Sequence, residues 1–180
     1  SSAASDVYKR QFMMGSPEDE VGRYDNEALH QVTLTKGFWL ADTTVSQALW
    51  HAVMGNNPSG FKGDDLPVVS VNWNDTQEFI QRLKQIYTEE AFRLPTETEW
   101  EYACRAGTQA PFSTGKEITA KQASYGGQEG KTIPVKSFEP NPWGFYQMHG
   151  NVWEWCENYY GEYPAGAVQD PIGPETGEFR

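Results

Sequence analysis

Apolar residues recur at helical spacing in three stretches of the chain, and polar residues that can cap a helix stand before each stretch. The first predicted helix has apolar positions from Val45 to Val53. Thr43 and Thr44 precede it and can cap its N-terminus, and Gly55 is a natural stop. The pattern predicts an amphipathic helix with one buried face.

The second predicted helix opens at residues 72–75 and has a longer apolar face. That face consists of Phe79, Ile80, Leu83, Ile86 and Tyr87. From the apolar spacing of this helix and the next, we expect Phe79 and Leu83 to be buried together with Trp100 between the two helices.

The third predicted helix carries the clearest start signal. Thr96 and Glu99 stand three residues apart, which is the spacing of a capping box. Trp100, Ala103 and Cys104 then fall on one face of the helix. The sequence therefore predicts a helix that starts near residue 97 and buries this face.

Strand signals are short, and much of the chain shows no regular pattern. Residues 31–35 alternate between polar and apolar, and residues 38–40 and 68–71 are further candidate strands. After residue 107, Gly, Pro, Asn and aromatic residues interleave up to residue 180. Loops rich in Trp and Tyr can still pack, because these side chains bury large areas and carry polar tips. We predict a loop-rich α+β fold with a small antiparallel sheet and low regular secondary structure.

The composition narrows the function classes. The chain has 180 residues, the usual size of one domain, and its seven Trp are atypical of a disordered chain. Its net charge of −11 disfavours binding to nucleic acid and to anionic membranes, since both need clustered cations. Its apolar runs are too short to span a bilayer, so we expect a soluble protein, cytoplasmic or exported.

The first eleven residues differ in character from the rest. The segment 1–11 reads SSAASDVYKRQ and has no apolar core of the kind that a signal peptide contains. We interpret it as linker or adaptor-derived sequence, and residues 12–180 as one domain. The natural N-terminus and any targeting signal stay open.

Short motifs follow one another from residue 12 onward. They are FMMGS at 12–16, HQVTL at 30–34, TVSQALW at 44–50, VNW at 71–73, RLPTE at 93–97, EWEYACRAG at 99–107 and GNVWEW at 150–155. In this order they resemble the formylglycine-generating enzyme (sulfatase-modifying factor) family. The resemblance implies a C-type-lectin-like fold, which the periodicity of the chain could not have named.

The same resemblance implies an activity. Enzymes of the family oxidise a cysteine of a sulfatase to formylglycine with Cu⁺ held by two thiolates, which suit this soft metal. In the family, a Gly-Pro-Glu-Thr-Gly stretch leads into an Arg-Gly-Gly-Ser-Trp segment, and the catalytic cysteines follow. Here GPETG at 173–177 is followed only by EFR. We therefore expect an incomplete domain without catalytic residues of its own, with copper only in a full-length form. A non-catalytic, lectin-like binding or structural module is the alternative.

The two cysteines of the chain do not resemble the family's copper pair. Cys104 lies on the apolar face of the third predicted helix, and Cys156 follows the Trp153-Glu154-Trp155 run. Buried cysteines commonly act as small core residues, and we favour that interpretation. The sequence leaves open whether the two form a disulfide with each other.

The resemblance also implies a structural calcium ion. Gln147 and Glu154 would bind it through their side chains, and Gly150 and Val152 through their carbonyl oxygens, a ligand set that suits Ca²⁺. Gln147 stands where the family more often has Asn or Asp. The alternative is that Glu154 only organises the loop. A second calcium loop would lie at residues 124–127.

Two further groups of residues have a plain structural interpretation. Trp143, Trp153 and Trp155 are expected in the core of the loops, and the alternative is that they form a binding surface, which their exposure would distinguish. The three histidines are scattered, so each is expected to form hydrogen bonds rather than to bind a metal.

Overall fold

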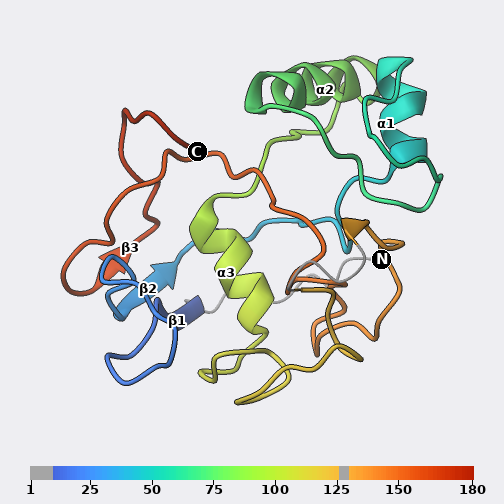
Figure 1. Ribbon diagram of the computed structural model, residues 1–180. Helices are drawn as coiled ribbons and strands as arrows, with labels where there is room; N and C mark the ends of the chain where they lie inside the picture. Colours follow the sequence, from blue (N-terminus) through green and yellow to red (C-terminus); the bar gives the residue numbers. More distant parts are fainter. Residues whose placement is uncertain (1–9, 126–129) are drawn as a thin grey trace.

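A computed structural model describes residues 10–125 and 130–180 of the chain (Figure 1). Its elements in chain order are β1 (Arg10–Met14), β2 (His30–Leu34), α1 (Gln47–Met54), α2 (Trp73–Ile86), α3 (Glu97–Arg105) and β3 (Val168–Gln169). The strands form one sheet in the order β1-β2-β3, with β1 and β2 antiparallel and β3 parallel to β2. The α+β, loop-rich architecture predicted from the sequence is confirmed, but the parallel β3 makes the small sheet mixed rather than antiparallel as predicted.

The sheet brings the start of the described chain together with residues near its other end. Residues 30–34 form a strand, as expected for the alternating stretch at 31–35. Its inward-facing Val32 and Leu34 form an apolar cluster with Met14 of β1. Arg10 and Gln11, within the expected linker segment, belong to β1 and lie opposite Leu34 and Thr33.

Two other candidate strands are not regular strands. Residues 38–40 have no strand pairing. Residues 68–71 are joined to the segment before α1 by one backbone hydrogen bond, from Val68 N–H to the Val45 carbonyl. Short apolar runs cannot by themselves specify a pairing partner.

Helices α1 and α2 pack against each other, away from the sheet (Figure 1). Ser46 rather than Thr43 or Thr44 caps α1, and its side chain accepts a hydrogen bond from Leu49 N–H at 3.3 Å. Asn72 caps α2 and forms a capping box with Asp75.

The packing of α2 differs from the expectation. Phe79 stacks on Trp50 of α1, with ring centroids 5.1 Å apart, and Leu83 packs in the same cluster. Trp100 instead packs with Ala103 and Cys104 in a separate cluster. The predicted association of Phe79, Leu83 and Trp100 is therefore wrong. The helical period identifies which face is buried, but it does not say which neighbour covers that face.

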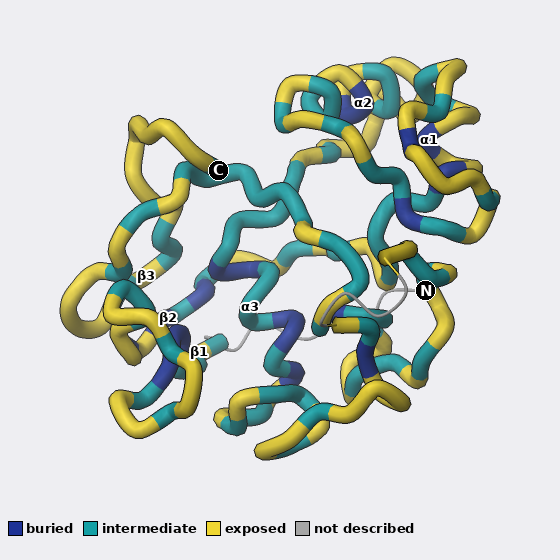
Figure 2. Tube along the Cα trace, viewed as in Figure 1, coloured by how far each residue is buried: buried dark blue, intermediate teal, exposed yellow. Residues whose placement is uncertain are grey.

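Helix α3 lies at the centre of the molecule and is the most deeply packed helix (Figure 2). It has the predicted capping box between Thr96 and Glu99. Two guanidinium nitrogens of Arg93 each donate a hydrogen bond to the Glu99 carboxylate at 2.6 Å. The positive charge of Arg93 thereby neutralises a mostly buried carboxylate. One side of α3 contacts β1, and irregular loops surround the rest.

No helix in residues 10–125 and 130–180 is both long enough and apolar enough to cross a bilayer.

Candidate functional site

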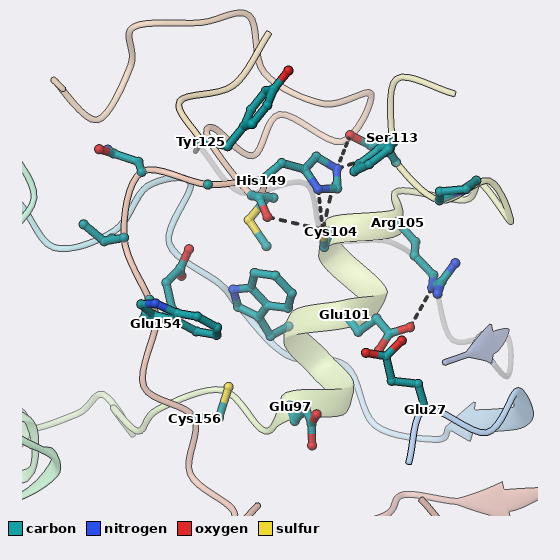
Figure 3. Close-up of a pocket in the computed structure, with 18 of the residues that line it drawn as sticks. Glu27, Glu97, Glu101, Cys104, Arg105, Ser113, Tyr125, His149, Glu154 and Cys156 are labelled. Atoms are coloured by element: carbon teal, nitrogen blue, oxygen red, sulfur yellow. Dashed lines mark hydrogen bonds and ion pairs between the residues drawn. The ribbon is translucent and has the colours of Figure 1, made fainter. Parts of the chain in front are cut away.

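A cavity of about 1050 Å³ extends along α3 and is partly enclosed by loops, with a wide opening to solvent (Figure 3). Segments far apart in the sequence contribute to its wall, from the end of β1 to the loop at 158–163. A space of this size could hold a small molecule or a few residues of a peptide. The cavity is therefore the candidate functional site.

Acidic side chains of α3 line one side of the cavity. Glu101 pairs with Arg105 one turn later at 2.7 Å and accepts a hydrogen bond from Gly15 N–H at 2.9 Å. Arg105 also donates to the Gly15 carbonyl at 2.6 Å. These contacts attach the end of β1 to α3, so Glu101 and Arg105 have a structural role at the cavity wall.

Glu97 lies one turn before Glu101 on the same helix face. Tyr163 Oη lies 2.9 Å from Glu97 Oε1 and 3.4 Å from Glu101 Oε2. Burial raises the pKa of Glu97, while its hydrogen bonds with Tyr163 and Asn158 lower it in part. Burial also raises the pKa of Tyr163, so its hydroxyl stays protonated and can donate to a carboxylate.

Cys104 and His149 face each other at another part of the cavity (Figure 3). The Cys104 sulfur lies 3.8 Å from both ring nitrogens of His149, and the thiol donates to the Met148 carbonyl at 3.5 Å. Ser113 N–H donates to His149 Nε2 at 3.1 Å, so that nitrogen is an acceptor. Burial lowers the pKa of His149, with a further contribution from Arg105, and the ring is neutral. His149 thus forms hydrogen bonds, as expected for a lone histidine.

Cys156 lines the cavity toward Glu97, away from Cys104 (Figure 3). Both cysteines are free, which resolves the question of a mutual disulfide. Burial raises the pKa of each thiol to about 12, so both are protonated at neutral pH. Cu⁺ requires thiolates. Cys104 and Cys156 lie at separate parts of the cavity and are protonated, so they do not form a ready thiolate pair.

The four expected calcium ligands lie in the loop at 147–154, which is attached to its neighbours. Gln147 Nε2 donates to the Pro134 carbonyl, while its Oε1 is buried and has no hydrogen-bond partner in the described part of the chain. Gly150 and Asn151 both have positive φ, 84° and 65°. Gly150 is required because a Cβ atom there would lie 2.1 Å from the Ser124 carbonyl oxygen.

Asn151 contributes more than sequence reasoning assigned to it. Its side chain accepts from Ile133 N–H at 3.0 Å and donates to the Ile133 carbonyl at 3.1 Å, while its own N–H donates to Ser124 O at 2.7 Å. It therefore holds the loops around residues 124 and 133 against the 147–154 loop. The Gly-Asn pair was the only signal of this role in the sequence. Part of the second predicted calcium loop, residues 126–127, lies outside the described residues.

Glu154 points toward the cavity (Figure 3). Burial raises its pKa to about 7, and the indole N–H of Trp100 opposes that shift. The Trp100 nitrogen does not reach full hydrogen-bond geometry with any partner among the described residues. The carboxylate thus lacks a strong compensating partner, and a cation would supply one. Among the described residues, no cluster of three His, Cys, Asp or Glu side chains could hold a metal by itself, so any cation here needs amide and carbonyl oxygens.

The aromatic residues of this region divide into two groups. Trp155 is half-buried and donates to the Val71 carbonyl at 3.0 Å. Trp153, by contrast, is fully exposed at 102% and lies at the cavity, and Trp143 is 40% exposed. The expectation that all three form a core is wrong for Trp153.

Comparison with known proteins gives consistent matches. Residues 7–179 match the family described as the sulfatase-modifying factor enzyme 1-like domain. The formylglycine-generating enzyme of Thermomonospora curvata is 37% identical over 164 residues, which cover 79% of this chain and 50% of that enzyme. The serine/threonine-protein kinase pkn1 of Chlamydia caviae is 40% identical over 119 residues, 63% of this chain and 18% of the kinase.

A solved structure confirms the architecture. The variable protein 1 of Treponema denticola superimposes with a TM-score of 0.80 at 28% identity, over 95% of this chain and 78% of that protein. The C-type-lectin-like fold expected from the sequence motifs is thereby confirmed. The chain spans about half the length of the T. curvata enzyme that it matches.

Proposed function

Since the chain belongs to the sulfatase-modifying factor family, we propose that it is the substrate-binding part of a formylglycine-generating-type oxidase. In this proposal the cavity along α3 binds a cysteine-containing segment of a sulfatase-type protein. The observation that carries it is Trp153, a fully exposed indole at the cavity. Exposed aromatic side chains at a concave site commonly anchor a bound peptide.

The described residues supply binding rather than oxidation. Cys104 and Cys156 are protonated thiols at separate parts of the cavity, and they do not form the thiolate pair that Cu⁺ needs. We therefore propose that the 180-residue chain binds the peptide and does not oxidise it.

Peptide binding can be measured by fluorescence anisotropy with a labelled sulfatase-type cysteine peptide. Replacing Trp153 by Ala should weaken binding at least about fivefold, the effect of losing an interface anchor of about 1 kcal/mol. Trp39 is 68% exposed but does not line the cavity, so Trp39→Ala is the matched control and should bind like wild type. Absence of binding by wild type, or equal losses in both variants, would contradict the proposal.

Oxidation is tested separately. The purified chain is incubated with Cu⁺, oxygen and the same peptide, and the product is analysed by mass spectrometry beside the T. curvata enzyme. Formation of formylglycine by this chain above the background without protein would overturn the assignment of a binding role alone.

The second candidate function is a non-catalytic binding or structural module. Its support is the 119-residue similarity to a kinase of which this region makes up only a small part. The same fold serves unrelated functions, so family membership does not exclude it. A folded chain that fails to bind the sulfatase-type peptide would favour this candidate.

We further propose that the 147–154 loop holds a calcium ion through Gln147, Gly150, Val152 and Glu154. The unpartnered, buried Gln147 Oε1 and the poorly compensated Glu154 carboxylate support this donor set, since Ca²⁺ prefers mixed carboxylate and neutral oxygen ligands. Bound calcium would hold the loop in place by neutralising Glu154.

Melting temperatures measured with EDTA and with added Ca²⁺ test the calcium proposal. Calcium should raise the melting temperature of wild type and leave Glu154→Gln nearly unchanged, because a ligand that binds only the folded state stabilises it. If wild type melts at the same temperature in both conditions, the loop is a purely structural turn.

A further inference from the structure

The guanidinium group of Arg180 lies between two aromatic rings. Its central carbon is 3.8 Å from the ring centroid of Trp73 and 3.7 Å from that of Tyr159. The same side chain donates a hydrogen bond to the carbonyl of Glu157. Two rings at this distance, together with a carbonyl acceptor, match what a planar cation needs for cation–π binding. We call Trp73 and Tyr159 the aromatic clamp.

Neighbouring segments hold the Trp73 ring and the backbone close to Tyr159. Trp73 is the first residue of α2, and its indole N–H donates to the Cys156 carbonyl at 3.1 Å. The segment that carries Tyr159 is itself held by Glu157, whose N–H donates to the Pro95 carbonyl at 2.8 Å ahead of α3. The clamp therefore lies where α2, the start of α3 and the 155–160 segment meet.

The segment 170–180, which we call the strap, is held at both of its ends and packs closely on the 158–161 segment between them. At one end, Asp170 accepts hydrogen bonds from Thr35 N–H and Oγ1. At the other end, the Phe179 carbonyl accepts from Tyr160 N–H at 2.9 Å. Residues 172–179 are all exposed, and Arg180 is half-buried again. Arg180 thus adds a side-chain anchor at that end of the strap, next to the contacts of Pro174 with Gly161 and of Gly177 with Tyr159.

The strap lies directly against the cavity wall. A Cβ atom on Gly173 would come within 2.9 Å of the Asn158 side chain, so the two segments are in close contact there. Asn158 lines the cavity and accepts a hydrogen bond from Glu97 N–H at 2.7 Å. Arg180 itself lines the cavity, as does Cys156, whose carbonyl accepts the hydrogen bond from Trp73 of the clamp.

We propose that Trp73 and Tyr159 form a guanidinium-binding clamp, and that its occupation by Arg180 fastens the strap along the wall of the cavity. Release of Arg180 loosens the strap beside the clamp and opens this part of the cavity. The chemical class that the clamp accepts is a planar guanidinium, which stacks on both rings at once. An alkylammonium is a weaker ligand because it is compact and strongly hydrated. The proposal does not depend on what the cavity binds.

The two thiols of the protein report on the proposed opening. Cys156 lies at the strap end of the cavity, while Cys104 lies beside His149 (Figure 3). Alkylation by iodoacetamide, followed over time by peptide mass spectrometry, measures both thiols in one sample. Cys104 serves as the internal control, because global unfolding exposes both thiols and local opening exposes only Cys156.

Arg180→Ala should raise the alkylation rate of Cys156 on the order of tenfold, the factor for losing stacking on two rings, and leave the Cys104 rate unchanged. Arg180→Lys keeps the charge and should give an intermediate rate. Lys121→Ala removes an exposed cation elsewhere and should behave like wild type. An unchanged Cys156 rate in Arg180→Ala would overturn the proposal, as would an equal rise at Cys104 or a Lys variant as fast as the Ala variant.

Discussion

Replacing Gly150 by Ala tests the geometry of the 147–154 loop directly. Gly150 has φ of 84°, and an added Cβ would lie 2.1 Å from the Ser124 carbonyl oxygen. The backbone atoms on both sides would have to move apart. The hydrogen bond from Asn151 N–H to the same Ser124 oxygen, now 2.7 Å long, would be lost or lengthened.

The expected loss of stability is the sum of two effects. A non-glycine residue in the left-handed region costs about 1–2 kcal/mol. The lost backbone hydrogen bond adds about 1 kcal/mol. We therefore expect Gly150→Ala to lower the free energy of unfolding by about 2–3 kcal/mol, which for a domain of this size lowers the melting temperature by roughly 4–12 °C.

Gly144→Ala is the matched control. Gly144 has a similar φ of 89°, but a Cβ there would meet nothing within 4 Å. Gly144→Ala should lower the free energy of unfolding only by the cost of placing a non-glycine residue in the left-handed region, about 1–2 kcal/mol. Urea unfolding followed by Trp fluorescence gives both free energies, with unchanged m-values showing that the transition stays comparable. Equal losses in the two variants would refute the close contact between Gly150 and Ser124.

Three further predictions concern single groups. Burial raises the pKa of Glu154 from 4.5 to about 7, so in calcium-free protein the protonated Glu154 contributes stability below pH 4.5, and this contribution is lost as the pH rises to 7. The melting temperature should therefore decline less across this pH range in Glu154→Gln than in wild type. Parallel pH profiles of the two proteins would contradict the assignment. Cys104 and Cys156, with pKa values of about 12, should react with iodoacetamide at pH 8 far more slowly in the folded protein than in urea, and equal rates would show that the thiols are not buried. Trp50→Ala should lower the free energy of unfolding by about 3–5 kcal/mol, because Trp50 is buried and stacks on Phe79. Trp39 is exposed, so Trp39→Ala should change the free energy of unfolding by less than about 0.5 kcal/mol. Similar losses in the two variants would refute the assigned core.

Features that depend on residues close together in the chain could be predicted from the sequence. The capping boxes of α2 and α3 each join residues three positions apart, so their spacing is visible in the sequence and the structure has both. The cap of α1 was misassigned because Thr43, Thr44 and Ser46 are all good capping residues. The order of the family motifs also identified the fold, which local patterns could not.

The arrangement of the candidate site was not visible in the same way. Tyr163 contacts Glu97 across 66 positions of sequence, and His149 lies beside Cys104 across 45 positions. Such pairs leave no periodic signal, because each residue also suits a plain structural role. Asn151 appeared only as a turn residue, although its side chain joins two loops.

The sequence by itself determined the helices, the strand at 30–34, the acidic charge and the family. Each of these follows from local spacing, composition or the order of motifs. Only the tertiary structure decided that Phe79 packs on Trp50 rather than on Trp100, that Trp153 is exposed at a cavity, and that Arg180 lies between Trp73 and Tyr159. The physical reason is that an apolar or aromatic side chain gains free energy from burial against any suitable surface. Which surface it meets therefore depends on how the whole chain closes around it.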